Sequence, residues 1–430
     1  MGWHSRGGIG YLIFAASYLA TAHVPAPVKA QSVYGAEWEP RQEVSAAVEP
    51  GTTIVPSLRV AERYDSNVFF VPGTNLEDFV TTVSPQVKVA HKNQWVEARM
   101  GAGATGEVYV KNPGLNYVGG NAAVDLDLDR AVNSLVRGLG LRISDTLSYT
   151  PQPPAFAAPT GSSQISEAFV QGIQARRANS FTNIATVEAS YFFSSFMGVT
   201  STYTDRRIRF GTPQATPTGI EQGGVRDTDF QTLTSGVLAK VSASDTVSLL
   251  HQYQKGRISD PERGETGFST QGALVRWSRA ITPTLQAVGE GGFSRISPNG
   301  DVYPVGAASL QWDEQYTTAR LSYSQGIAPS FFAVSAPLLS RAVTGTIRRR
   351  ITETLSALLS GSYAVNQSVP DSSLVRFESY SVTSSLDYKI SRSLTVTFSY
   401  TRSEFQRAFS GQSFDFDRNM VMLNLLAEWR

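Results

Sequence analysis

The chain of 430 residues carries 37 basic and 36 acidic side chains, and charged residues make up only 17% of it. This balance argues against a nucleic-acid-binding protein, which would need a basic surface. Cysteine is absent, so the chain forms no disulfide and offers neither a thiolate nucleophile nor a thiolate metal ligand.

The first thirty residues have the pattern of a secretory signal peptide. A basic start precedes an apolar stretch at 9–24, and Val28-Lys29-Ala30 offers a small-residue cleavage site. A transmembrane anchor is the alternative, but two prolines end the apolar stretch, and no other run approaches the roughly 20 apolar residues of a spanning helix. We expect cleavage before Gln31, a short periplasmic tail at 31–50 and one further domain at 51–430.

Segments of alternating apolar and polar residues recur from about residue 52 onward. In 394–401, for example, Leu394, Val396, Phe398 and Tyr400 alternate with hydroxyl residues. Successive side chains of a strand point to opposite faces, so each such segment has an apolar and a polar face. No helix-period segment of useful length follows residue 50 to cover the apolar faces. The pattern predicts strands with lipid on one face and water on the other.

Short and long connections alternate between these strands. We expect short connections at 92–93, 130–133, 194–195, 243–245, 282–283, 313–314, 352–353 and 391–393. We expect longer ones at 69–77, 111–116, 151–179, 209–226, 259–265, 298–300, 328–337, 367–376 and 408–415. The alternation of short and long connections predicts an all-β, transmembrane, antiparallel up-and-down barrel. We expect about eighteen strands, with sixteen as the alternative. The short turns would lie on the periplasmic side and the longer loops on the extracellular side. No fixed-length motif repeats, which argues against a propeller or β-helix.

Charged residues on the polar faces are the candidates for lining a pore. By the same alternation, the inward cations are Arg59, Arg63, Lys88, Arg99, Arg142, Arg320, Arg348 and Arg350, and the inward carboxylates are Asp125, Asp127, Asp129 and Glu188. Charges that face each other across a water-filled channel can select ions, although solvated lumen charges without that role are the alternative.

The three aspartates at 125–129 do not form a metal site. In one strand Asp125 and Asp129 would lie roughly 13 Å apart, too far to share one ion. A calcium-binding loop is excluded because Arg130 stands where glycine is needed. We expect neither a metal nor a cofactor.

The longest predicted loop, 151–179, is rich in proline and alanine and has few charges before its end. Such a loop would be poorly solvated outside the barrel, so we expect it to fold into the pore and constrict it. The candidate residues are Phe156, Ile165, Phe169, Arg176 and Arg177. A disordered or surface-packed loop is the alternative.

Catalysis has little support in the sequence. Outside the predicted signal peptide only His91 and His251 remain as histidines. His251 lies on the apolar alternation, where we expect it near the outer rim, and no G-x-S-x-G motif accompanies it. We therefore expect no enzymatic activity.

Two segments resemble the opening strands of the putative beta-barrel porin 2 family. They are 56–68, which contains Tyr64-Asp65-Ser66-Asn67, and 77–85, in which an acidic residue leads to a valine and a proline. The resemblance covers about residues 50–430. It implies an outer-membrane barrel associated with exopolysaccharide production, in which Asp65 and Asn67 fix a strand end or loop. The chain ends in Trp429-Arg430, so the terminal aromatic residue that barrel assembly machinery recognises is displaced by one position.

Three functions are compatible with these patterns. A conduit for exopolysaccharide export comes first because of the resemblance, ahead of a general diffusion porin and of a structural or adhesion barrel with a plugged lumen. With the signal peptide cleaved, we expect the barrel in the outer membrane of a Gram-negative bacterium. Its partners would be outer-membrane lipid, polysaccharide, periplasmic export machinery and barrel assembly machinery, but no nucleic acid.

Overall fold

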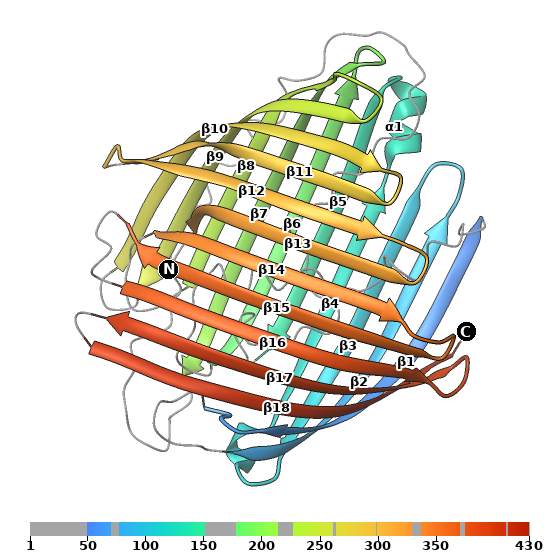
Figure 1. Cartoon of the computed structure of the whole chain (residues 1–430), viewed down its shortest axis with the longest axis vertical. Coiled ribbons are helices and arrows are strands. Elements are labelled where there is room, and N and C mark those ends of the chain that lie inside the picture. The colour runs from blue at the N-terminus through green and yellow to red at the C-terminus, as the bar shows by residue number, and fades with distance from the viewer. Residues whose placement is uncertain are drawn as a thin grey trace, which may run out of the picture.

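The chain forms one closed antiparallel barrel of eighteen strands (Figure 1). The computed structural model describes residues 50–69, 77–150, 178–213, 227–260, 264–297, 299–328, 337–369, 375–409 and 412–429. Each strand pairs with its neighbours in sequence, and β1 (Gly51–Asp65) also pairs with β18 (Gln412–Glu428), which closes the sheet. The predicted fold class is thus confirmed, with eighteen strands rather than sixteen. The predicted signal peptide and most of the 31–50 tail lie outside the described residues.

The remaining strands follow in chain order. They are β2 Asp78–Lys92, β3 Glu97–Tyr109, β4 Tyr117–Asp127, β5 Leu139–Thr150, β6 Ala178–Phe192, β7 Met197–Pro213, β8 Asp227–Lys240, β9 Asp245–Asp260, β10 Gly264–Thr282, β11 Leu285–Ser297, β12 Val302–Asp313, β13 Thr317–Ala328, β14 Leu338–Arg350, β15 Leu355–Ser368, β16 Val375–Lys389 and β17 Leu394–Phe409. Within the described residues, no helix is long and apolar enough to cross a bilayer.

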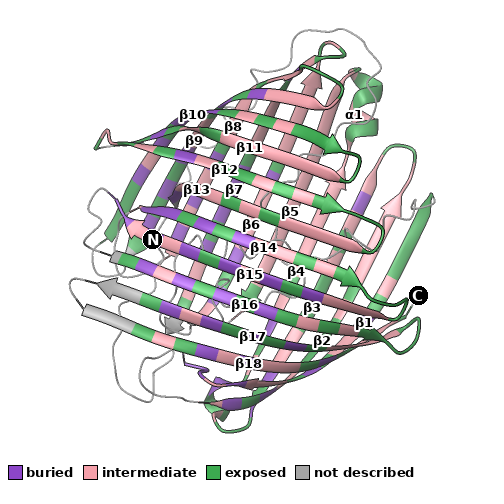
Figure 2. Ribbon diagram, viewed as in Figure 1, coloured by how far each residue is buried: buried purple, intermediate pink, exposed green. Residues whose placement is uncertain are grey.

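The alternation of side chains sets the two faces of the barrel wall. In β17, Phe398 and Tyr400 are exposed, whereas Ser399 and Thr401 are buried. Figure 2 shows exposed and buried residues alternating along the strands in the same way. The large apolar side chains therefore cover the outer surface, and the small hydroxyl side chains face inward. The alternation predicted for this segment is confirmed.

Four short turns share one local motif of two hydroxyl residues separated by a single residue. The pairs are Ser242 and Ser244, Thr282 and Thr284, Thr352 and Thr354, and Ser391 and Ser393. In each turn the hydroxyl oxygen of the first residue accepts a hydrogen bond from the backbone N–H of the second hydroxyl residue, at 3.1–3.3 Å. The motif satisfies a turn amide from within the turn, so the strands reverse direction without help from other segments.

The connection between β4 and β5 differs from the predicted tight turn at 130–133. Strand β4 ends at Asp127, and a seven-residue helix, α1 (Asp129–Leu135), follows it. The carboxylate of Asp129 accepts the backbone N–H of Leu141, and the side-chain oxygen of Asn133 accepts that of Gly138. The expectation of a continuous strand over 124–129 was wrong, because a helix of two turns is too short to show its period in the sequence.

Strands near the long connections extend further than predicted. Strand β7 continues to Pro213 and β17 to Phe409, although connections were expected from 209 and 408. The extension of β7 begins with the charged residue Arg209, which occupies a strand position beyond the apolar belt, where both faces of the wall tolerate polar side chains.

A buried ion pair joins the first and last strands at the long-loop end. Asp65 is fully buried and accepts hydrogen bonds from the guanidinium of Arg418, one of them from Nε at 2.8 Å. The backbone N–H of Asn67 also donates to Asp65, at 3.2 Å, and the Asn67 side chain donates to the carbonyl of Asp417. Asp65 and Asn67 therefore fix a strand end, as the family resemblance implies.

Replacing Asp65 alone should destabilise the barrel strongly. Asp65→Ala leaves Arg418 buried without its counter-charge, which typically costs about 3–5 kcal/mol. The measurement is urea unfolding of the protein in lipid vesicles, followed by tryptophan fluorescence. Lys111→Ala, which breaks the more exposed pair with Glu77, should cost no more than about 1 kcal/mol. The double change Asp65→Val/Arg418→Met should recover much of the loss, and equal destabilisation by all three variants would contradict this account.

Candidate functional site

The inner wall of β14–β17 is lined by hydroxyl side chains, which we call the hydroxyl wall. All of its members are buried: Ser340, Thr344, Ser360, Ser362, Ser379, Ser381, Thr383, Ser399, Thr401 and Ser403. Register places Thr344, Ser362, Ser381 and Ser403 in one row across four strands. Neighbours within the wall bond to each other, as Ser381 does to Ser403 at 3.0 Å and Thr383 to Thr401 at 2.9 Å.

The hydroxyl wall has spare hydrogen-bonding capacity. The hydroxyl oxygens of Ser360, Ser362 and Ser379 have no hydrogen-bond partner among the described residues. A buried hydroxyl without a partner is costly, so water or a solute in the lumen is the natural source of one. Small hydroxyl side chains on polar strand positions were visible in the sequence, but which of them share a row depends on strand register.

Most of the predicted pore-lining charges gather on the inner face near the short turns. On β4 and β5, Arg142 bonds to Asp125, and it stands opposite Glu188 of β6 in the register. Asp127 accepts the backbone N–H of Asp129 at 3.1 Å. The structure thus brings together residues that the sequence could only place on the same kind of face.

The neighbouring strands β2 and β3 extend this group. Arg99 forms an ion pair with Glu97, and Lys92 lies 3.8 Å from the same carboxylate. Lys88 faces inward on β2 and forms no ion pair with another described residue. Positive and negative charges are therefore interleaved along the arc from β2 to β6, which we call the mixed-charge arc.

Other predicted charges lie halfway round the barrel. Arg320 on β13 and Arg348 on β14 face inward, and Arg348 lies 3.9 Å from Asp387 of β16. A further inward pair, Arg276 and Glu290, was not predicted from the sequence; their charged groups lie 2.6 Å apart across β10 and β11. The inward position of Arg276 was obscured by the irregular pattern of 266–281.

Three predicted lining residues have other surroundings. Arg63 lies 3.2 Å from Glu107 and takes part in the buried cluster around Asp65. Arg350 lies at the short-turn rim, where its guanidinium stacks over the ring of Tyr316. Asp129 was expected to line the pore from a strand but belongs to helix α1. These residues stabilise the wall and its edges, as the contacts around each of them show.

Arg59 forms no ion pair with another described residue, unlike Arg99 and Arg142. It lies in the middle of β1, and its Nε atom has no hydrogen-bond partner among the described residues. Together with Lys88 it is a cation that no described carboxylate neutralises. The predicted constriction residues Phe156, Ile165, Phe169, Arg176 and Arg177 lie outside the described residues.

Neither histidine is part of a catalytic arrangement. His91 bonds to Thr52 and Asn93 beside a short turn. His251 is exposed in the middle of β9, opposite Ser235, and not near the outer rim as expected. No group of three or more histidine, aspartate or glutamate side chains in the described part of the chain could hold a metal ion.

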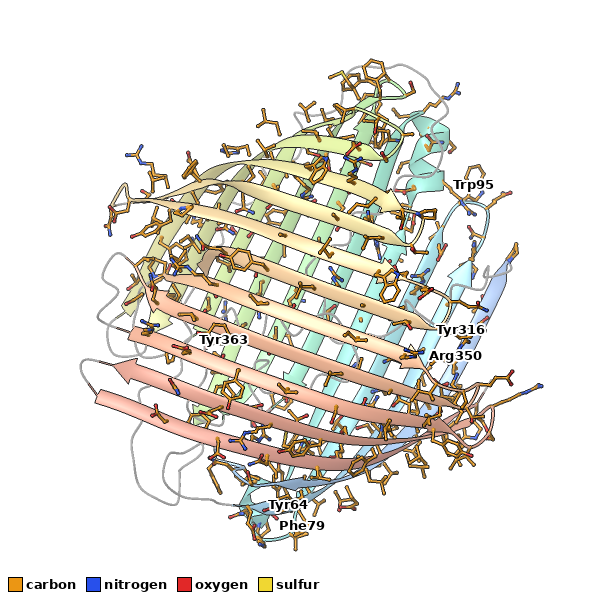
Figure 3. The ribbon with its side chains drawn as sticks, viewed as in Figure 1. Tyr64, Phe79, Trp95, Tyr316, Arg350 and Tyr363 are labelled. Atoms are coloured by element: carbon orange, nitrogen blue, oxygen red, sulfur yellow. The ribbon has the colours of Figure 1, made fainter. Side chains whose placement is uncertain are left out.

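Aromatic side chains mark both ends of the outer surface (Figure 3). Tyr64 and Phe79 lie together at the long-loop end, with ring centroids 5.3 Å apart, and Tyr363 lies toward that end as well. Trp95 and Tyr316 lie at the short-turn end. Lys111 and Tyr64 donate hydrogen bonds to Glu77 and hold its pKa below the ordinary value. Two aromatic girdles around an apolar belt are the pattern of a barrel embedded in a bilayer.

Reversing the charge of the two inward cations that form no ion pair should change the ion selectivity of the pore. Arg59→Glu/Lys88→Glu reverses two charges on the inner face, so the pore should become more permeable to cations. The measurement is the reversal potential in a planar bilayer under a salt gradient. Arg341→Glu, a reversal on the outer face, is the matched control and should leave the potential unchanged. Identical potentials for the inner-face variant and the unchanged protein would contradict a lining role.

Comparison with known proteins agrees with the barrel architecture. The family model described as Putative beta-barrel porin 2 matches residues 303–428, a segment from β12 to β18. No curated protein matches the sequence at a significant level.

Several solved structures of barrels are similar to the chain in fold. The siderophore receptor PirA from Pseudomonas aeruginosa is 8% identical, with 89% of this chain and 81% of that chain covered and a TM-score of 0.43. PirA from Acinetobacter baumannii has a TM-score of 0.44 at 8% identity, with coverage of 88% and 81%. OpdQ from Pseudomonas aeruginosa has a TM-score of 0.42 at 10% identity, with coverage of 88% and 98%.

The closed wall, the apolar belt with its two girdles and the match of 303–428 to a porin family agree with one another. The chain is a β-barrel of the outer-membrane kind.

Proposed function

We propose that the barrel is a conduit for exopolysaccharide on its way to the cell surface. The hydroxyl wall is the observation that carries this proposal. A polysaccharide presents hydroxyl groups along its whole length, and the rows of serine and threonine can exchange hydrogen bonds with it at every step. Conduction requires contacts that are favourable enough for entry and weak enough for release. Neutral hydroxyl groups, each contributing about 1 kcal/mol, meet that requirement better than charges do.

Aromatic side chains on the inner face support the same function. Phe405 of β17 and Phe416 of β18 stack with ring centroids 4.9 Å apart, on the inward alternation of their strands. Phe377 of β16 is buried on the inner face close to the long-loop end. Phe377 and Phe405 are almost fully buried, so a sugar, whose faces are apolar and whose edges are polar, would meet the partly exposed ring of Phe416.

A general diffusion porin is the second candidate function. The mixed-charge arc favours it, because such charges act on small ions and polar solutes as well as on polymers. The opposite strands carry Arg320 and Arg348, so the two sides of the lumen differ in charge. A diffusion porin would need only this field and a wet passage.

The export function also implies separate partners. Polymer synthesis and any energy source would come from periplasmic or inner-membrane machinery, which delivers the chain to the short-turn end. The barrel assembly machinery would meet β18, where the backbone N–H of Trp429 donates to the carbonyl of Pro56 at 3.0 Å. Both partners are parts of the proposal.

Polysaccharide should block the current through the barrel in a way that depends on the hydroxyl wall. We expect dextran added at the short-turn side of a planar bilayer to produce resolved blockades. Ser362→Ala/Ser381→Ala removes two hydroxyls that face each other in the register. Because each contributes about 0.5–1.5 kcal/mol, losing both should shorten the blockades roughly fivefold to a hundredfold. The measurement is the distribution of blockade times.

The outer face offers a matched control for this experiment. Ser201→Ala/Ser235→Ala removes another facing pair, bonded at 2.7 Å, from the lipid side of β7 and β8. This variant should keep the original blockade times. Free ion flow without any blockade by dextran would instead favour the diffusion porin. A barrel that carries no current would favour a structural or adhesion role with a plugged lumen.

A further inference from the structure

The outer surface of β7–β9 carries a group of charges near the long-loop end. Arg207 and Arg209 on β7 and Lys255 and Arg257 on β9 form what we call the outer cationic patch. Together with Asp205, Asp229 and Gln231 they line a cavity of about 210 Å³. These side chains share the outward alternation with the exposed Tyr203, Leu233 and Leu249, so the cavity opens on the outside of the barrel.

Strand register arranges the patch as a small lattice. Arg207 stands opposite Asp229, which stands opposite Arg257. One step closer to the membrane belt, Asp205 stands opposite Gln231, which stands opposite Lys255. The four cations therefore flank a central strand that presents Asp229 and Gln231 to the cavity and begins with a further carboxylate, Asp227.

Carboxylates pair with all three arginines of the patch and leave Lys255 as its one cation without an ion pair among the described residues. Asp205 lies 2.7 Å from the guanidinium of Arg207, and Asp229 bonds to Arg209. Asp227 lies 3.9 Å from Arg209, and Glu265 of β10 lies 3.4 Å from Arg257 at the edge. Lys255 forms no ion pair with another described residue. Asp227 and Glu265 are not part of the cavity lining, which holds four cations and two carboxylates, so an anion in the cavity would meet more cations than carboxylates.

The patch lies immediately beyond the apolar belt. Two positions closer to the short turns on the same strands stand Tyr203, Leu233 and Tyr253. A step of two residues along a strand is about 7 Å. A molecule seated in the patch would therefore have its anionic group against the cations and its apolar part against the belt.

The outer surface elsewhere has a different charge pattern at this level. On β15–β17 the hydroxyls of Tyr363 and Tyr380 donate to Glu378 and Glu404. Arg376 and Arg402 each accompany one of these carboxylates. The lattice on β7–β9, with an unpaired lysine and a cavity, is thus a local feature and not part of a uniform ring.

We propose that the outer cationic patch binds the phosphorylated headgroup of a lipid in the outer leaflet. Arginine guanidinium groups bind phosphate oxygens through paired N–H donors, and Lys255 adds a mobile point charge. The amide of Gln231 can bond to a hydroxyl of the same headgroup. The apolar belt begins directly beside the cavity, on the side toward the short turns. Acyl chains can pack on this belt, which favours a lipid over a free anion. This inference needs only the outer-membrane location of the barrel and is independent of what the lumen carries.

Reversing the charges of Lys255 and Arg257 tests the proposal. The barrel, reconstituted in phosphatidylcholine nanodiscs, is titrated with fluorescently labelled, doubly phosphorylated lipid A, and binding is followed by fluorescence anisotropy. We expect Lys255→Glu/Arg257→Glu to weaken binding at least tenfold. The same lipid A without its phosphates should bind the unchanged barrel about as weakly as the variant binds the phosphorylated form.

Arg341→Glu/Arg402→Glu provides a matched control, because it reverses two outward cations on β14 and β17. This variant should bind lipid A like the unchanged protein. Equal binding by all three proteins would overturn the proposal. Tight binding of inorganic phosphate alone would overturn the lipid assignment in favour of a soluble anion. Circular dichroism melting of each variant separates lost binding from a damaged barrel.

Discussion

Every backbone amide in the hydrocarbon region of a bilayer needs a hydrogen-bond partner within the protein, and the rest of this structure depends on that constraint. An open sheet would leave two unpaired edges in lipid, so β1 must find β18 across nearly the whole length of the chain. The buried pair of Asp65 and Arg418 lies at this seam. It couples the two strands whose pairing no short turn can enforce, and Asn67 and Ser66 add bonds to the backbone beside it.

The alternation of side chains allowed most of the architecture to be predicted from the sequence. A period of two residues needs no knowledge of distant segments, and hydroxyl pairs such as Ser391 and Ser393 mark turns locally. The strand number and the inner and outer faces follow from these signals. The helix at Asp129–Leu135 was missed because its two turns interrupt the pattern no more than a polar turn would. The end of β7 from Arg209 onward was predicted as a loop, because the residues there do not alternate in hydropathy.

The candidate site could be predicted only in part, because its geometry is non-local. The sequence places Asp125 and Arg142 on inward faces, but their contact depends on the register between β4 and β5. The rows of the hydroxyl wall likewise combine four strands. Arg63 was predicted to line the lumen, and its bonding to Glu107 could not be foreseen from either residue alone. In the sequence, the outer cationic patch is visible only as charged residues near the ends of three strands. That these three strands are neighbours with their charges on one face follows from the structure.

The self-contained turns have a consequence for how the chain could be rearranged. Because Thr352 and Ser391 satisfy their turns from within, cutting one turn removes no support from the others. Both ends of the barrel lie on the short-turn side, where Glu428 stands opposite Ser57, six residues after the start of β1 at Gly51. A linker there, with a cut at another short turn, would give a circular permutant with the same wall. The order in which the strands occur in the gene is therefore one of several that this barrel can accommodate.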